Sequence, residues 1–310
     1  MLDFKGIVPP LVTPFDETGE LRYDAFERNF DKYLEAGIVG YLVLGSNGEA
    51  VYLDRAEKLK LIESARKRVP HAMMLLAGTG AESTRATIEL TKEAAGRGVD
   101  AVLVNNPFYY KGQMTSDVYR AHFSSVADAS PVPVILYNVP VFTGISMDAK
   151  VVIELSKHPN IVGLKESSGD VRLISEVVWN APKDKFSVMA GAAPVLFPNM
   201  MAGARGGIVA LACAAPQACL TLYQAVVAGD YPRASEVQRI VATAAVAVTG
   251  KYGIAGLKAA MDLEGFQSGI PRSPLSPLHP NQVEDLRQIF RKMNEELAEL
   301  SPPLVSFRPS

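Results

Sequence analysis

The 310-residue chain is poor in the side chains that most metal and redox sites use. It contains two cysteines, Cys213 and Cys219, and four histidines, and neither set shows the spacing of a metal site. Two cysteines are also too few for a disulfide framework in a chain of this length, so we expect a reducing cytoplasm as its location. The sequence therefore predicts no metal site.

Long apolar runs and an excess of one charge are absent as well. No run approaches the ~18 residues that a membrane helix needs, and the N-terminus lacks the apolar core of a signal peptide. The 31 basic and 33 acidic residues give a net charge of −2, and the basic residues form no long run. This balance argues against a nucleic-acid surface and against a polybasic membrane patch. We expect an ordinary globular protein that binds neither.

Short apolar segments rich in β-branched residues recur along the chain, with helical stretches between them. Their apolarity is continuous rather than alternating, which is typical of parallel strands covered on both faces. Eight strand–helix units close most economically into a (β/α)8 TIM barrel of the α/β class. An open doubly wound sheet is less favoured, because no Gly-x-Gly-x-x-Gly turn follows the first segment. The segments begin near Ile7, Tyr41, Met73, Ala101, Val132, Ile161, Phe186 and Gly207.

The strand pattern stops after Pro216, and the rest of the chain is mostly helical in character. Four prolines within residues 271–280 exclude a helix interior there and predict an extended connector. We therefore expect a barrel over residues 1–215, a helical region over 216–300 packed on it, and a loose tail over 301–310. The best helix candidates in this region are residues 220–228, 234–248 and 280–300.

One buried strand ends in a lysine, Lys165, and the preceding strand ends in a tyrosine, Tyr137. An ammonium group on a buried strand is unfavourable unless it is paired or deprotonated. A pair with Glu166 is disfavoured, because successive strand residues point to opposite faces. A desolvated lysine has a lowered pKa, and its neutral amine can attack a ketone to form an imine. The phenol of Tyr137 could relay the protons that this reaction moves.

A glycine-containing turn, Gly45-Ser-Asn-Gly-Glu49, follows the second predicted strand. Its backbone N–H groups could form a nest for a carboxylate, with Ser46 and Asn47 adding side-chain donors. An ordinary structural turn would look the same, so the motif is weak on its own. We expect Glu49 to hold the turn in shape rather than to act as a base.

Active sites of such barrels lie at the C-terminal ends of the strands. The predicted substrate contacts at these ends are Ser46, Asn47, Gly48, Gly191 and Ile208. Tyr109 and Tyr110 follow the fourth strand, although aromatic loop residues often only cover a core or an interface.

Together these motifs resemble the N-acetylneuraminate lyase/dihydrodipicolinate synthase family of class I pyruvate aldolases over nearly the whole chain. The resemblance is carried by Gly45–Glu49, Tyr137-Asn-Val-Pro140 and Gly163-Leu-Lys-Glu-Ser167. It implies that Lys165 forms a Schiff base with pyruvate or another 2-oxo acid, without a cofactor, and that Tyr137 relays protons. It also implies that Ser46 supplies the relay hydroxyl and that Asn47 contacts the pyruvate carboxylate.

The same resemblance has implications for assembly. Tyr109, two residues beyond Pro107, matches a tyrosine that is lent across a dimer interface into the neighbouring active site. Members of the family are usually tetramers built from two such dimers, so the resemblance implies a homotetramer in which Tyr109 is catalytic.

The expected second substrate depends on the branch. Members that condense pyruvate with aspartate semialdehyde typically carry an arginine where this chain has Phe142, and a phenyl ring cannot bind a carboxylate. Ser46-Asn47, residues 76–84 and residues 158–163 are instead similar to the 4-hydroxy-2-oxoglutarate aldolase branch. We therefore predict an aldolase reaction of pyruvate and glyoxylate, with dihydrodipicolinate synthase (4-hydroxy-tetrahydrodipicolinate synthase) as the alternative. A non-catalytic 2-oxo-acid sensor is a further reading, which the intact Lys165, Tyr137 and Ser46 disfavour.

Overall fold

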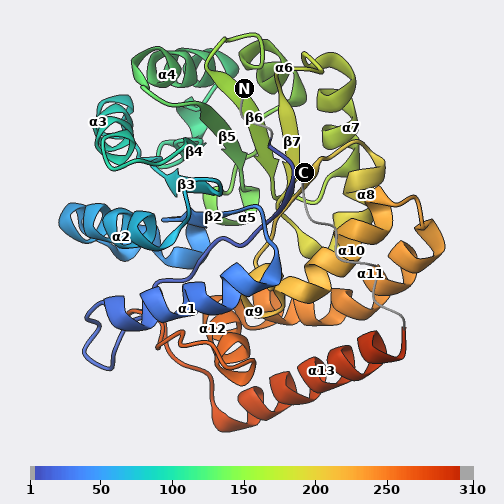
Figure 1. The fold of residues 1–310 in the computed structure, drawn as a ribbon. Helices are drawn as coiled ribbons and strands as arrows, with labels where there is room; N and C mark the ends of the chain where they lie inside the picture. The colour runs from blue at the N-terminus through green and yellow to red at the C-terminus, as the bar shows by residue number, and fades with distance from the viewer. Residues whose placement is uncertain (1–3, 301–310) are drawn as a thin grey trace.

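The computed structural model describes residues 4–300, in which eight parallel strands form a barrel surrounded by helices (Figure 1). Each strand from β2 to β8 pairs with the next, and β8 pairs with β1. The ring closes just after β1, where the Leu11 N–H donates to the Leu42 carbonyl at 2.8 Å. The predicted (β/α)8 barrel is confirmed. Its strands are β1 (Gly6–Val8), β2 (Gly40–Val43), β3 (Met74–Gly78), β4 (Ala101–Asn105), β5 (Val134–Asn138), β6 (Ile161–Glu166), β7 (Ser187–Ala190) and β8 (Gly206–Ile208).

Helices connect successive strands and cover the outside of the barrel (Figure 1). Several begin at capping side chains: Asp54 forms a capping box with Glu57, and Asp170 accepts two backbone N–H groups. The main barrel helices are α1 (Tyr23–Ala36), α2 (Arg55–Arg68), α3 (Thr84–Ala95), α4 (Ser116–Ala129), α6 (Ala149–Leu155), α7 (Val171–Asn180) and α8 (Leu196–Met201). Short helices α5 (Pro140–Thr143) and α9 (Leu211–Ala214) follow β5 and β8.

The apolar core has two layers, as the continuous apolarity of the strands predicts. The larger cluster lies between the strands and the outer helices and includes Phe26 and Phe30 of α1. The smaller cluster fills the inside of the barrel and includes Leu42, Tyr137 and Ile208. Tyr137 therefore points into the barrel and not toward the helices.

The chain ends in a helical extension, at the bottom and lower right of Figure 1. Its helices are α10 (Pro216–Val227), α11 (Tyr231–Val246), α12 (Gly253–Leu263) and α13 (Pro280–Glu299). The three helix candidates correspond to α10, α11 and α13, and residues 271–279 form an irregular connector. Helix α12 was not predicted, because Gly253 and Gly256 weaken the helical pattern. Helix α10 packs on β1, so the boundary at residue 215 stays a prediction, and the predicted tail lies outside the described residues.

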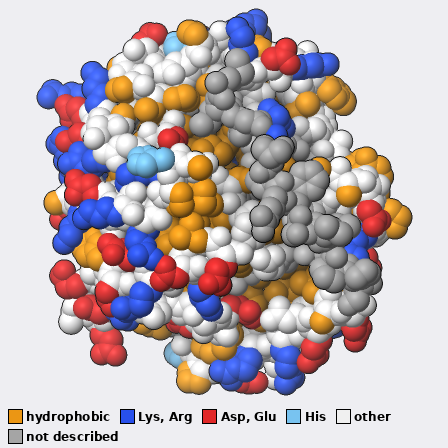
Figure 2. Space-filling view, viewed as in Figure 1, with side chains coloured by type: hydrophobic (Ala, Val, Ile, Leu, Met, Phe, Trp, Pro, Cys, Tyr) orange, Lys and Arg blue, Asp and Glu red, His pale blue; other side chains and the backbone are white. Residues whose placement is uncertain are grey.

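Basic and acidic side chains are interspersed over the helices on the face drawn in Figure 2, with no large patch of one sign. Between residues 4 and 300, no helix is long and apolar enough to cross a membrane. The cytoplasmic location stays a prediction.

Candidate active site

Lys165 and Tyr137 lie side by side at the C-terminal ends of adjacent strands. Strands β5 and β6 pair so that Tyr137 is opposite Lys165, and side chains at paired positions of parallel strands point the same way. The Lys165 Nζ lies 4.2 Å from the centre of the Tyr137 ring. Both side chains are buried, and Lys165 is only 4% exposed. The structure thus brings together the two residues that the motifs singled out.

Within the described part of the chain, no acidic side chain forms an ion pair with Lys165. The neighbouring Glu166 points the other way, as expected, and accepts hydrogen bonds from Asn138 Nδ2 at 2.7 Å and from the Ser168 N–H at 2.5 Å. Burial raises the pKa of the Glu166 carboxyl, although these hydrogen bonds oppose the shift. Lys165 is therefore a buried amine whose close neighbour is a phenol ring and not a carboxylate.

Ser46 approaches the same phenol from another strand end. Its Oγ lies 3.3 Å from the Tyr137 hydroxyl oxygen, close enough for a proton to pass between the two groups. Ser46 begins a short 3₁₀ turn, η1 (Ser46–Gly48), that directly follows β2 and includes Asn47 and Gly48. A hydroxyl, a phenol and an amine thus form a chain at one mouth of the barrel.

Strained backbone flanks this turn on both sides. Leu44 and Glu49 are the two non-glycine residues with positive φ in the described chain, at 57° and 53°. Gly78 of β3 passes so close to the Leu44 carbonyl that a Cβ at Gly78 would lie 2.1 Å from its oxygen. Such conformations persist only where the surrounding structure enforces them, and they cluster at functional sites.

Ser167 belongs to this mouth and was not among the predicted residues. Its buried Oγ has no hydrogen-bond partner within residues 4–300, and a Cβ at Gly191 would lie 1.7 Å from it. The hydroxyl therefore lies directly over Gly191, which was a predicted contact. Continuing the period of two one residue beyond the end of β6 could have identified Ser167, since it places residue 167 on the same face as Lys165. The predicted contact Ile208 is fully buried in the inner cluster.

Tyr109 and Phe142 lie on the surface of the single chain, 73% and 58% exposed. The Tyr109 ring packs edge-on against Tyr110, and a Cβ at Gly144 would lie 2.7 Å from the Nζ of Lys111. The loop after β4 therefore lies against the end of α5, which carries Phe142. The chain by itself does not bury Tyr109, and it places exposed aromatic rings on two adjoining loops.

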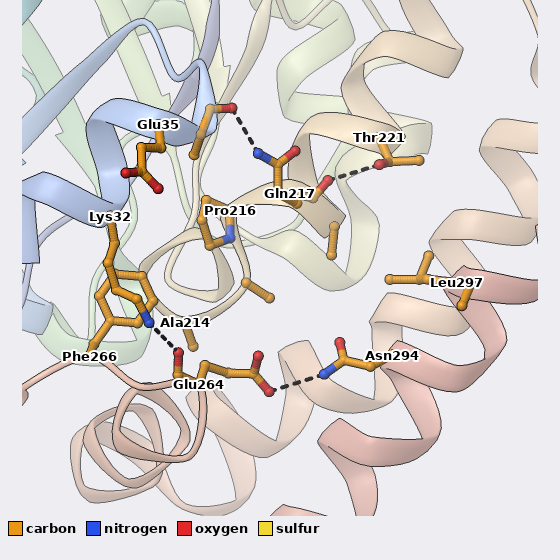
Figure 3. Close-up of a pocket in the computed structure, with 14 residues that line it drawn as sticks. Lys32, Glu35, Ala214, Pro216, Gln217, Thr221, Glu264, Phe266, Asn294 and Leu297 are labelled. Atoms are coloured by element: carbon orange, nitrogen blue, oxygen red, sulfur yellow. Dashed lines mark hydrogen bonds between the residues drawn. The ribbon is translucent and has the colours of Figure 1, made fainter. Parts of the chain in front are cut away.

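A cavity lies away from this mouth, between α1, α10, α13 and the segment after α12 (Figure 3). Its volume is about 600 Å³, and none of the predicted site residues lines it. Some of its polar groups are bonded to one another: the Lys32 Nζ donates to the Glu264 carbonyl at 2.8 Å, and Asn294 donates to the Glu264 carboxylate at 3.1 Å. This cavity is a crevice between helices that carries none of the chemistry described above.

No three His, Cys, Asp or Glu side chains of the described residues are grouped so that they could hold a metal ion. Cys213 and Cys219 are buried as free thiols, and burial raises the pKa of both. A buried thiol with a raised pKa is a poor nucleophile, so Lys165 is the candidate nucleophile at the barrel mouth.

The dihydrodipicolinate synthetase family model matches residues 3–293 of the chain. A 4-hydroxy-tetrahydrodipicolinate synthase from Exiguobacterium sibiricum is 37% identical over 272 residues, which cover 88% of this chain and 92% of the relative. One from Methanosarcina mazei is 34% identical and covers 94% of this chain and 98% of the relative. These matches confirm the predicted family and do not single out its 4-hydroxy-2-oxoglutarate aldolase branch.

Solved structures of the same family superpose closely on this chain. A dihydrodipicolinate synthase from Bacillus anthracis superposes with a TM-score of 0.89 at 29% identity, covering 94% of this chain and 99% of the other. A prophage protein of the dihydrodipicolinic acid synthase family from E. coli K12, in complex with pyruvate, superposes with a TM-score of 0.88 at 28% identity and the same coverage. The relatives' names fit the synthase alternative better than the glyoxylate reaction.

Proposed function

Because the chain belongs to the dihydrodipicolinate synthetase family, whose members are class I pyruvate-dependent lyases, we propose that it forms an imine between Lys165 and pyruvate. The observation that carries this proposal is the buried Lys165 amine, 4.2 Å from the Tyr137 ring and without an acidic partner among residues 4–300. A structural lysine in such a place would need a carboxylate. A nucleophilic amine needs a proton relay, and Tyr137 with Ser46 supplies one.

The reaction begins when the neutral Lys165 amine attacks C2 of pyruvate, while the Ser46–Gly48 turn and Asn47 hold the pyruvate carboxylate. Tyr137 donates a proton to the C2 hydroxyl, which leaves as water, and an iminium forms. The Tyr137 phenolate then takes a proton from C3, which gives an enamine and restores the phenol, and C3 attacks the aldehyde carbon. The aldehyde oxygen takes a proton from Tyr137, and water then releases the product from Lys165. Cleavage is the same sequence in reverse.

The aldehyde should itself carry a carboxylate. The names of the curated relatives make aspartate semialdehyde the first candidate, which would make the enzyme a 4-hydroxy-tetrahydrodipicolinate synthase. One observation favours glyoxylate instead: Phe142 lies exposed beside the mouth. A cation would be needed there to bind the carboxylate of aspartate semialdehyde, which is the longer of the two substrates. In either case the unpartnered Ser167 hydroxyl over Gly191 is available to donate a hydrogen bond to substrate.

We also propose that the protein is a homotetramer built from two dimers, in which Tyr109 enters the neighbouring subunit's site. Support comes from the exposed rings of Tyr109, Tyr110 and Phe142 and the exposed Val141, which lie on adjoining loops. Exposed apolar groups that are gathered in this way mark protein–protein contact sites. Analytical ultracentrifugation of the wild type and of Tyr109→Ser tests the assembly: the variant should dissociate more readily, and an unchanged assembly would contradict this interface.

The test of the reaction is borohydride reduction in the presence of pyruvate, followed by intact-mass spectrometry and peptide mapping. One pyruvate-derived adduct per chain on Lys165 is the expected result. Folded protein without an adduct would contradict the proposed function. Initial rates with aspartate semialdehyde and with glyoxylate, each with pyruvate, then decide between the two aldehydes.

A further inference from the structure

The turn at Ser46–Gly48 is closed by a buried glutamate, Glu49. The Glu49 N–H donates to the Ser46 carbonyl at 3.1 Å, so the left-handed backbone of Glu49 fixes the end of the turn. Its side chain is only 2% exposed. A non-glycine residue keeps a positive φ only under constraint, and the contacts of this carboxylate supply the constraint.

Both oxygens of the Glu49 carboxylate are held by residues from the far end of the chain. Oε1 lies 2.6 Å from the Nζ of Lys258, and Oε2 accepts a hydrogen bond from the Arg272 N–H at 2.8 Å. Lys258 is on α12, and Arg272 is in the connector before α13. The turn at the barrel mouth is therefore bonded directly to the C-terminal extension.

Lys258 also reaches the other side of the turn. Its Nζ donates to the carbonyls of Thr13 and Ile270, at 2.8 and 2.6 Å, and the Thr13 hydroxyl donates to the Gly48 carbonyl at 2.7 Å. The ammonium therefore has two carbonyl acceptors and an ion pair with Glu49. One buried ammonium thus holds the turn through Glu49 at its end and through Thr13 at its flank.

Arg272 anchors the connector in turn. Its guanidinium donates to both oxygens of Glu57 at 2.8 and 2.6 Å and to the Tyr52 carbonyl at 2.8 Å. The ring of Phe15 lies 4.6 Å from the cationic centres of both Lys258 and Arg272. This clamp, defined as Glu49, Lys258 and Arg272, adds an ion pair and a hydrogen bond at Glu49 to the turn's own backbone hydrogen bonds.

We propose that Lys258 is a positioning residue for 2-oxo-acid binding, which acts through Glu49 to set the direction of the Ser46 and Asn47 N–H groups; the Gly48 N–H donates to the Gly45 carbonyl at 3.0 Å. The inference rests on the proposed function and extends it to residues that touch no substrate. A misplacement of about 1 Å can cost on the order of 10²-fold in rate. We therefore expect loss of the clamp to raise the half-saturating pyruvate concentration for imine trapping by about tenfold or more.

The experiment compares Lys258→Met, Glu49→Gln and the double variant. Each single variant leaves one buried charge unpaired and should lose stability, whereas the double variant removes both charges and should regain most of it. A double variant with near wild-type thermal unfolding and a half-saturating pyruvate concentration raised about tenfold supports the inference. A wild-type half-saturation in the folded double variant overturns it. Failure of the double variant to fold also overturns it, because the pair would then serve the fold and not the turn.

The matched control is Lys251→Met with Asp285→Asn, which removes another ion pair of the same extension, with an Nζ–Oδ2 distance of 2.9 Å. This control should leave the pyruvate dependence unchanged, and an equal rise would overturn the inference. If the wild type forms no adduct, the proposed function falls and the inference falls with it. If the wild type forms an adduct that the double variant forms equally well, only the inference falls.

Discussion

Two buried lysines, one at the barrel mouth and one in the C-terminal extension, are held in opposite ways. Lys258 is 1% exposed, and its ammonium meets a carboxylate and two carbonyls. Lys165 is 4% exposed and meets a phenol ring. Burial lowers the pKa of the Lys258 ammonium, and the nearby Glu49 carboxylate opposes this shift. Among the described residues, Lys165 has no such carboxylate partner.

This difference is the one expected between a structural cation and the amine that we propose forms the imine. A lysine that is held by two backbone carbonyls and an ion pair is not free to attack a substrate carbonyl. A lysine whose amine has no such partners and lies beside a proton relay can attack a substrate carbonyl. The partners of a buried amine, and not burial by itself, therefore indicate its role.

Lys165→Ala should produce the largest effect on activity. Turnover should fall below detection, since no other buried amine at the mouth can form the imine, and borohydride with pyruvate should leave no adduct. Thermal unfolding should change little, because no ion pair of the described chain is lost. Residual aldolase activity near the wild-type rate would contradict the proposal that Lys165 forms the imine.

Tyr137→Phe should lower kcat by roughly 10²–10⁴, the usual contribution of a general acid–base group. The phenyl ring keeps the contact with Lys165 and loses only the hydroxyl that lies 3.3 Å from Ser46. Steady-state kinetics with pyruvate and the preferred aldehyde provide the measurement. A rate within a few-fold of the wild type would mean that another group relays the proton.

Replacing each lysine by methionine should lower the free energy of unfolding by different amounts in the two variants. Lys258→Met leaves Glu49 buried without its cation and should lower the free energy of unfolding by about 3–5 kcal/mol. Lys165→Met leaves no carboxylate behind, so its change should be below about 1 kcal/mol. Urea unfolding of the two variants checks this, and equal losses would abolish the distinction between them.

Substitution of His122 should have the smallest effect, which is on the pH dependence of the free energy of unfolding. His122 is a basic group that burial keeps neutral. Desolvation lowers its pKa to about 4, so the folded protein holds the ring neutral beside Thr84. The unfolded chain takes up this proton near pH 6.5, so it binds more protons than the folded chain between pH 6.5 and 4. The stabilising contribution of neutral His122 is present above pH 6.5 and is lost as pH falls toward 4. His122→Gln should flatten this part of the unfolding free-energy profile, and an identical slope would contradict the assignment.

Much of the fold could be predicted because the sequence patterns that indicate strands lie within short segments of the chain. Continuous apolar segments gave the parallel barrel, and a lysine and a tyrosine at neighbouring strand ends predicted the pair that β5 and β6 bring together. The clamp could not be predicted in the same way, since Lys258 and Thr13 are 245 positions apart and α12 has a weak helical pattern. The identity of the aldehyde depends on a few loop residues such as Phe142, whose surroundings in an assembly the single chain does not contain.

The clamp also ties the order of synthesis to the order in which the barrel mouth is completed. Residues 45–49 leave the ribosome early, whereas Lys258 and Arg272 are among the last residues of the fold to be made. A nascent chain that has already formed all eight strands still lacks the partners of Glu49. If Lys258 positions the turn as we propose, the turn reaches its final geometry only after residues 258–272 have been synthesised.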